Sequence, residues 1–124
     1  MGDGKPTYSI KQAESNDGIV WSNIQRVEVG PSGCRCVGWP MVWKDGVFKM
    51  IYSHRNLNSG YKLGLAFSQD GITWNDSIID GLNPSNNKED WDSEMICYTA
   101  KYCNYIFYNG NGYGETGIGL AEIL

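Results

Sequence analysis

The cysteine and histidine ligands that this chain could offer a metal are four cysteines and a single histidine, His54. Cys34 and Cys36 are separated by one residue, and Cys97 and Cys103 are separated by five. Structural zinc sites use paired ligands at characteristic short spacings, which neither pair has. We therefore expect no metal and no cofactor, and we expect reduced thiols that are mostly buried.

Two aspartates stand in a heptapeptide that occurs twice, SNDGIVW at 15–21 and SQDGITW at 68–74. An Asp side chain closes a turn by accepting hydrogen bonds from nearby backbone groups, and the Gly that follows adopts positive φ at no steric cost. The Trp then re-enters the sheet and fixes the turn to its neighbour. The residues interpreted as structural in these turns are Asp17, Gly18, Trp21, Asp70, Gly71 and Trp74.

Aromatic side chains are a third group of residues that could serve a chemical function. The chain has 5 Trp, 8 Tyr and 16 Gly among 124 residues, a combination that favours strands joined by tight turns. An exposed aromatic ring also packs on the apolar face of a sugar, although most aromatic residues fill cores. Carbohydrate binding is therefore one open interpretation.

β-Strands must position these residues, because apolar residues recur at helical spacing over no long window. Short β-rich runs alternate with turn residues instead. The predicted strands are 6–14, 19–29, 35–43, 47–54, 61–67, 72–79, 93–100, 105–108 and 116–123.

The strands repeat as a unit. YKLGLAFS (61–68) matches TGIGLAEI (116–123) and YSIKQAES (8–15), and KMIYS (49–53) matches YIFYN (105–109). A repeated antiparallel unit of about 50 residues is typical of a β-propeller blade. The sequence predicts half a blade at 6–29, a full blade at 35–79 and a three-stranded blade at 92–124, which together make about two and a quarter blades.

Four stretches resemble the five-bladed β-propeller superfamily of glycosidase-like proteins, which includes the arabinanase, levansucrase and invertase types (glycoside hydrolase families 43, 32, 68 and 130). They are PMVWKDGVFKMIYSHR (40–55), YKLGLAFSQDGITW (61–74), WDSEMICY (91–98) and YNGNGYGETGIGLA (108–121). They cover about half the chain and resemble the later blades. The resemblance implies a site in a central funnel, lined by carboxylates from the innermost strands.

Glycoside cleavage needs two carboxyl groups that face each other across the bond. The resemblance implies Asp92 and Glu94 as the catalytic candidates. Residues two apart in a strand share a face, so these two carboxyl groups cannot lie on both sides of a sugar. The substrate-binding candidates are Arg35, His54, Trp39, Trp91 and Tyr98.

Three functions stay open: a carbohydrate-binding protein that lacks a complete catalytic site on one chain, a glycoside hydrolase active only as an assembled dimer, and a non-enzymatic assembly module. Two chains of nine strands supply eighteen of the twenty strands in five blades, so we expect a homodimer that completes the ring.

The net charge is −4 at pH 7, with no basic stripe, so nucleic acid is not an expected partner. The chain has no apolar run of membrane-spanning length and no apparent signal peptide. We therefore expect a cytoplasmic protein without a membrane partner.

Overall fold

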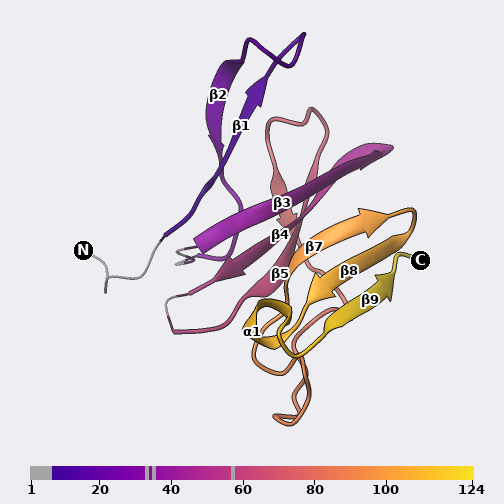
Figure 1. The fold of residues 1–124 in the computed structure, drawn as a ribbon. Coiled ribbons are helices and arrows are strands. Elements are labelled where there is room, and N and C mark those ends of the chain that lie inside the picture. The colour runs from indigo at the N-terminus through magenta and orange to yellow at the C-terminus, as the bar shows by residue number, and fades with distance from the viewer. Residues whose placement is uncertain (1–6, 33, 35, 57) are drawn as a thin grey trace.

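The computed structural model describes residues 7–32, 34, 36–56 and 58–124, and the strands of this part form three antiparallel sheets (Figure 1). The first sheet pairs β1 (Ile10–Glu14) with β2 (Ser22–Val27). The second holds β3 (Cys36–Asp45), β4 (Val47–Arg55), β5 (Lys62–Ser68) and β6 (Asn75–Ser77). The third holds β7 (Cys97–Tyr102), β8 (Tyr105–Asn109) and β9 (Ile118–Glu122). The expected all-β class is confirmed.

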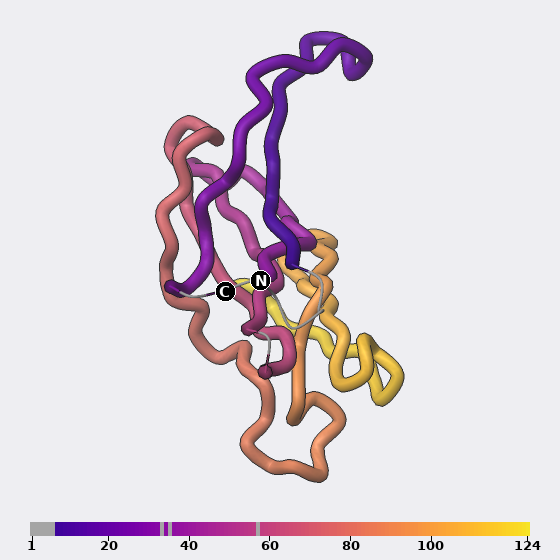
Figure 2. Tube along the Cα trace, turned by 90° about the vertical axis from the view of Figure 1, so that its left-hand side faces the viewer, coloured from indigo at the N-terminus to yellow at the C-terminus, as the bar shows by residue number. Residues whose placement is uncertain are grey.

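The second sheet lies between the other two and packs against each with a different face. One buried cluster joins it to the first sheet and contains Ile10, Val27, Val37, Met50, Tyr52 and Ala66. Another joins it to the third sheet and contains Ile51, Leu63, Ile96 and Ile106. The core is therefore divided between two sheet-to-sheet contacts, while hairpin β1–β2 and the loop before β7 project from opposite ends (Figure 2).

The tight turns follow from local sequence. Gly46 has φ 72° between β3 and β4, as the Asp45-Gly46 pair predicts for a short hairpin. Asp17 Oδ1 accepts hydrogen bonds from the N–H groups of Ile19 and Val20 at 2.8 and 2.9 Å. Asp70 Oδ1 accepts the two equivalent bonds in its own turn at the same distances.

The internal repeat is visible in the strand register. Tyr52 on β4 stands opposite Gly64 on β5, and Tyr108 on β8 stands opposite Gly119 on β9. Each Tyr ring covers its Gly so closely that an added Cβ would overlap the ring. The same packing device thus occurs in both the second and the third sheet.

Two expectations about local structure are wrong. β7 begins at Cys97 and not at residue 93, so residues 93–96 form part of a loop. A four-residue helix, α1 (Asn111–Gly114), occupies a segment for which no helix was expected, and Gly112 and Tyr113 inside it have positive φ. β2, β6 and β9 are shorter than predicted, whereas β3, β4 and β8 extend past their predicted C-terminal ends.

No disulfide joins the four cysteines, all of which the structure describes; Cys36 and Cys97 are fully buried, whereas Cys103 is exposed. Within the described residues, no group of three or more His, Cys, Asp or Glu side chains could hold a metal ion. In that same part of the chain, no helix has the length and apolar character needed to cross a membrane.

Candidate functional site

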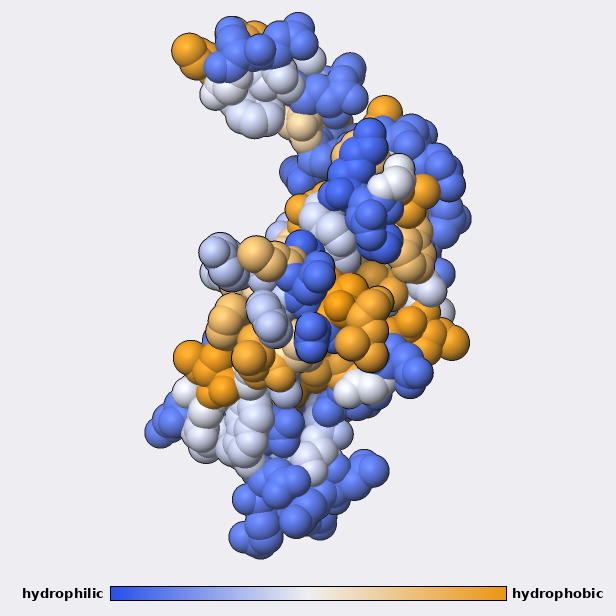
Figure 3. Space-filling view, turned by 90° about the vertical axis from the view of Figure 1, so that its right-hand side faces the viewer, coloured by the Kyte–Doolittle hydropathy of each residue, from blue (hydrophilic) through white to orange (hydrophobic). Residues whose placement is uncertain are grey.

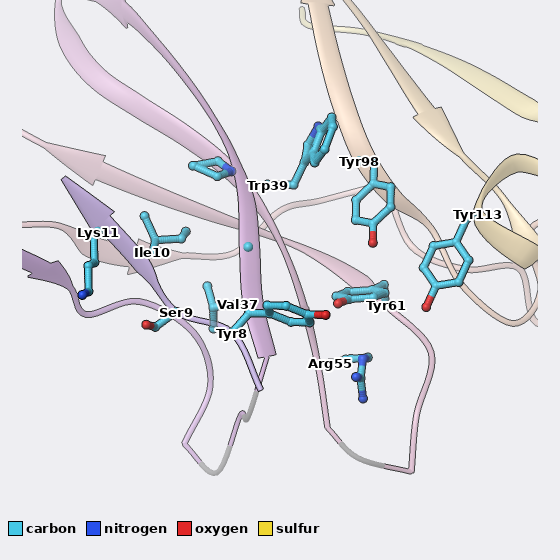
Figure 4. Close-up of a pocket in the computed structure, with 12 residues that line it drawn as sticks. Tyr8, Ser9, Ile10, Lys11, Val37, Trp39, Arg55, Tyr61, Tyr98 and Tyr113 are labelled. Carbon is cyan, nitrogen blue, oxygen red and sulfur yellow. The ribbon is translucent and has the colours of Figure 1, made fainter. Parts of the chain in front are cut away.

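An open cavity of about 550 Å³ lies where the segment before β1 meets β3, the end of β4, β7 and α1 (Figure 4). A cavity of this size is in the range of small-molecule sites. The backbone N–H of Val37 donates to the carbonyl of Tyr8 at 3.1 Å, which holds the N-terminal segment beside β3. The aromatic side chains that line the cavity are Tyr8, Trp39, Tyr61, Tyr98 and Tyr113.

Two β-bulges place the central rings of this aromatic pocket. Trp39 and Pro40 both stand opposite Tyr52, because the β3–β4 register shifts between Gly38 and Met41. The β7–β8 register shifts in the same way next to Tyr98. Trp39 and Tyr98 have φ of 51° and 57°, values that are uncommon for bulky residues. Bulges re-aim side chains near functional sites, and here they turn one ring from each sheet toward the other.

The rings contact one another across the two sheets. The Trp39 and Tyr98 ring centroids are 4.9 Å apart, and Tyr98 stacks on Tyr113 at 5.6 Å. Tyr61 lies 5.7 Å from Tyr98. Trp39 Nε1 donates to the carbonyl of Thr99 at 3.2 Å, so the indole is oriented by the neighbouring sheet. The result is a rigid aromatic wall that is still accessible, since Trp39 is 57% exposed.

The ionisable groups of the pocket favour binding over acid–base chemistry. The Arg55 guanidinium lies 5.4 Å from the centroid of the Tyr61 ring. Burial, followed by the proximity of Tyr61, raises the pKa of Tyr98 to about 12, so its hydroxyl stays protonated at neutral pH. Lys11 is the other charged residue of the lining, and no Asp or Glu is among the described residues there.

Asp92 and Glu94, the expected catalytic residues, do not lie on the innermost strand. Both belong to the loop before β7, so the inference that they share a strand face is wrong. Asn111 holds this loop, because its Oδ1 accepts hydrogen bonds from the N–H groups of Glu94 and Met95 at 2.7 and 3.1 Å. Glu94 is exposed and Asp92 is half-buried. Neither lines the aromatic pocket.

Trp91, expected to contact substrate, instead packs inside its own unit. Its ring stacks on Tyr108 with 5.8 Å between centroids. Gly110 and Gly117 lie against the same ring, too close to accept a Cβ without displacement. The Trp91 carbonyl accepts a hydrogen bond from the Thr116 hydroxyl at 2.6 Å. Trp91 therefore fixes the loop before β7 to the β8–β9 connection.

His54 and Arg35 are the two basic residues among the substrate-binding candidates. The His54 ring lies 5.8 Å from Tyr52 and does not line the aromatic pocket. Burial, followed by the charge of Lys62, lowers the pKa of His54, so the imidazole is neutral at physiological pH. Arg35 lies outside the described residues.

Of the seven candidate residues, the structure brings Trp39 and Tyr98 together in the pocket. Sequence reasoning missed Tyr8, Tyr61, Tyr113, Arg55 and Lys11. A signal existed for two of them, because Tyr8 and Tyr61 are aligned at the start of the repeated segments 8–15 and 61–68. Tyr113 enters through its contact with Tyr61 of the preceding unit, and Arg55 through its contact with Tyr61 in its own unit; the repeat pattern specifies neither.

No family model matches the chain, and no solved structure matches it. Two curated proteins of Mycobacterium tuberculosis are similar to it: Uncharacterized protein MT1551 of strain CDC 1551 / Oshkosh and Uncharacterized protein Rv1502 of strain ATCC 25618 / H37Rv. Each is 35% identical over 128 residues, which cover 94% of this chain and 40% of the relative. The chain thus spans well under half the length of these relatives.

Proposed function

We propose that the protein is a glycosidase-like, carbohydrate-binding part of a five-bladed β-propeller, and that the aromatic pocket holds the sugar. The observation that carries this proposal is the wall of rings formed by Trp39, Tyr61, Tyr98 and Tyr113. Such a wall offers apolar area to a pyranose, while tyrosine hydroxyls at its rim offer hydrogen bonds to the sugar.

The arrangement of the sheets supports the propeller interpretation. Three antiparallel sheets pack face to face in chain order, and the second and third share the Tyr-over-Gly register. β3 and β7 are the first strands of their sheets, and the residues that meet in the pocket, Trp39 and Tyr98, come from them. In a propeller the first strands of the blades surround the central channel, where ligands enter.

Sugar binding at this pocket follows from the properties of its walls. The tilted Trp39 and Tyr98 rings remove water from one face of a sugar, which is the apolar contribution to affinity. The Tyr98 hydroxyl remains a neutral donor and acceptor because its pKa is raised to about 12. Arg55 adds a cationic donor for hydroxyl or acidic oxygens.

Hydrolysis is the second candidate function, and it rests on Glu94. A glycosidase needs an acid and a partner carboxylate across the scissile bond, and the described lining of the pocket has neither. Hydrolysis therefore requires that assembly bring Glu94 and a second carboxylate to a bound sugar. Glu94→Gln is expected to abolish turnover of aryl glycosides if the assembled protein is a hydrolase, and to leave sugar binding unchanged.

The decisive experiment compares Trp39→Ala with Trp21→Ala in calorimetric titrations against a panel of neutral and acidic oligosaccharides. Trp39 and Trp21 are 57% and 56% exposed, so the two variants remove the same side chain at equal exposure. Loss of one stacking ring is expected to weaken sugar binding about tenfold or more for Trp39→Ala, and not for Trp21→Ala.

Equal affinities of the two variants would place the sugar elsewhere. If the wild-type chain binds no sugar in the panel and none raises its melting temperature, the carbohydrate proposal fails and the assembly-module alternative is favoured.

A further inference from the structure

One face of the third sheet is apolar and has nothing packed on it in the described part of the chain. Five exposed residues on alternating positions of β8 and β9 form this bare face: Tyr105, Phe107, Ile118, Leu120 and Glu122. Phe107 stands directly opposite Leu120, and Tyr105 opposite Glu122. Figure 3, which views the molecule from the right-hand side of Figure 1, shows hydrophobic side chains gathered across the middle of that side.

The internal repeat explains why this face is apolar. Phe107 corresponds to Ile51 at an offset of 56 residues, and Leu120 corresponds to Leu65 at an offset of 55. Ile51 is 3% exposed because the third sheet covers it, whereas Phe107 is 42% exposed and Leu120 is 59% exposed. The third sheet therefore presents the same packing surface that the second sheet buries against its neighbour. An apolar surface of this kind marks a protein contact.

The direction of packing identifies the complementary surface. The first sheet packs on the second, and the second packs on the third, each through the equivalent face. If the same order of packing continues, the partner surface that it leaves uncovered among the described residues is the outer face of hairpin β1–β2. The exposed residues of this outer hairpin face are Lys11, Ile24 and Arg26.

Charge supports the same match. Lys11 and Arg26 stand opposite each other on the hairpin, which gives its outer face two adjacent cations. Arg26 is near Glu28 at 3.2 Å, and both side chains are largely exposed, so this pair contributes little and is free to rearrange. The bare face carries Glu122 beside its apolar residues. An apolar patch with an acidic residue is thus complementary to a hairpin face that carries Ile24 and two basic residues.

We propose that two copies of this chain associate head to tail, with the bare face of each copy packed on the outer hairpin face of the other. Two identical contacts of this type form a closed dimer with a two-fold axis. The contact buries Phe107 and Leu120 against Ile24 and pairs Glu122 with Lys11 or Arg26 of the second copy. The association does not depend on sugar binding and would exist without it.

The test measures mass in solution by light scattering after size exclusion, over a range of protein concentrations. The wild-type chain is expected at twice the monomer mass. Leu120→Glu places a charge in the centre of the contact and is expected to give a monomer with unchanged circular dichroism. Ile78→Glu is the matched control, because Ile78 is 87% exposed and lies outside the bare face, and it is expected to remain dimeric.

A charge exchange tests the head-to-tail arrangement itself. Glu122→Lys is expected to weaken the dimer at least several-fold, and adding Arg26→Glu to the same chain is expected to restore it. A monomeric wild-type chain would overturn the proposal. A dimer that is insensitive to Leu120→Glu, or one that Arg26→Glu does not restore, would overturn it as well. Sugar titration of the Leu120→Glu monomer tests sugar binding separately. Failure of the dimer proposal can therefore be told apart from failure of the sugar-binding proposal.

Discussion

The two SxDGxxW turns have the same internal hydrogen bonds but different surroundings. In both, a Ser Oγ accepts the Gly N–H at 2.8 Å and the Asp holds the next two N–H groups. Trp74 packs against the buried cluster between the first two sheets, and its Nε1 donates to Gln12 at 3.3 Å. Trp21, its counterpart, is 56% exposed. The heptapeptide therefore encodes a turn, and a neighbouring sheet decides whether that turn also becomes part of the core.

The Tyr-over-Gly pairs extend this comparison between an interior copy and an edge copy. Tyr52 is 2% exposed and belongs to the cluster between the first two sheets, whereas Tyr108 is only half-buried. Since the two pairs share their geometry, any difference in their response to mutation measures the surroundings alone.

The largest effect is expected for Gly64→Ala. The new methyl group would overlap the Tyr52 ring, which has no free space to move into. Overpacking of this kind costs about 1–3 kcal/mol, and more where the backbone must shift. Urea denaturation of Gly64→Ala and Gly119→Ala makes the comparison, because the less buried Tyr108 can move aside. Equal losses for the two variants would contradict the interior-versus-edge distinction.

Tyr52→Phe is expected to have the next largest effect. The Tyr52 hydroxyl donates to Asp76 Oδ1 at 2.6 Å and thereby ties β4 to β6. Burial, followed by this contact with Asp76, raises the pKa of Tyr52, so the hydroxyl stays protonated. We expect a loss of about 1–2 kcal/mol in unfolding free energy, reduced because Asp76 is exposed. Tyr108→Phe serves as the edge control in the same denaturation series, and a larger loss there would refute the ranking.

Asp70→Ala and Asp17→Ala compare the two turns directly. Each variant removes two backbone hydrogen bonds, but the 68–74 turn also supports the first sheet, since Gln12 Nε2 donates to the Gly71 carbonyl at 3.0 Å. The melting temperature of Asp70→Ala is therefore expected to fall further than that of Asp17→Ala. If differential scanning calorimetry gives equal shifts, packing of the turn against β1 contributes nothing to stability.

The smallest expected effect is a change in the stability of the protein at acid pH. Hydrogen bonds from the N–H groups of Thr73 and then Ile72 hold the pKa of Asp70 below its ordinary value of 3.8. Because the pKa is lowered in the folded state, this stabilisation is complete above 3.8 and is lost as pH falls through the folded-state value. The stability gap between wild type and Asp70→Ala is therefore expected to narrow below pH 3.8. A gap of constant size between pH 7 and pH 2 would show that the carboxylate charge has no part in the turn.

Local features were predictable from the sequence and contacts between units were not. The turns at Asp17, Gly46 and Asp70 follow from residue types within a few positions, and the repeat correctly paired Tyr52 with Tyr108. The loop before β7 was mistaken for a strand because Asn111, from the far side of a hairpin, takes the N–H groups that a ladder would have used. The pocket combines side chains from distant segments, and only Trp39 and Tyr98 were anticipated.

The hydrogen bond from Trp39 to Thr99 and the contact of Trp39 with Tyr98 make the wall of the pocket a joint between two sheets. A ligand that fills the pocket contacts both sides of this joint, so its binding free energy is also free energy that holds the second and third sheets together. Any motion that separates the sheets would pull the two rings apart and release the ligand. The affinity of the pocket and the stability of this contact between sheets are therefore thermodynamically linked, and mutations at the cluster of Ile51, Leu63 and Ile106 are expected to alter both.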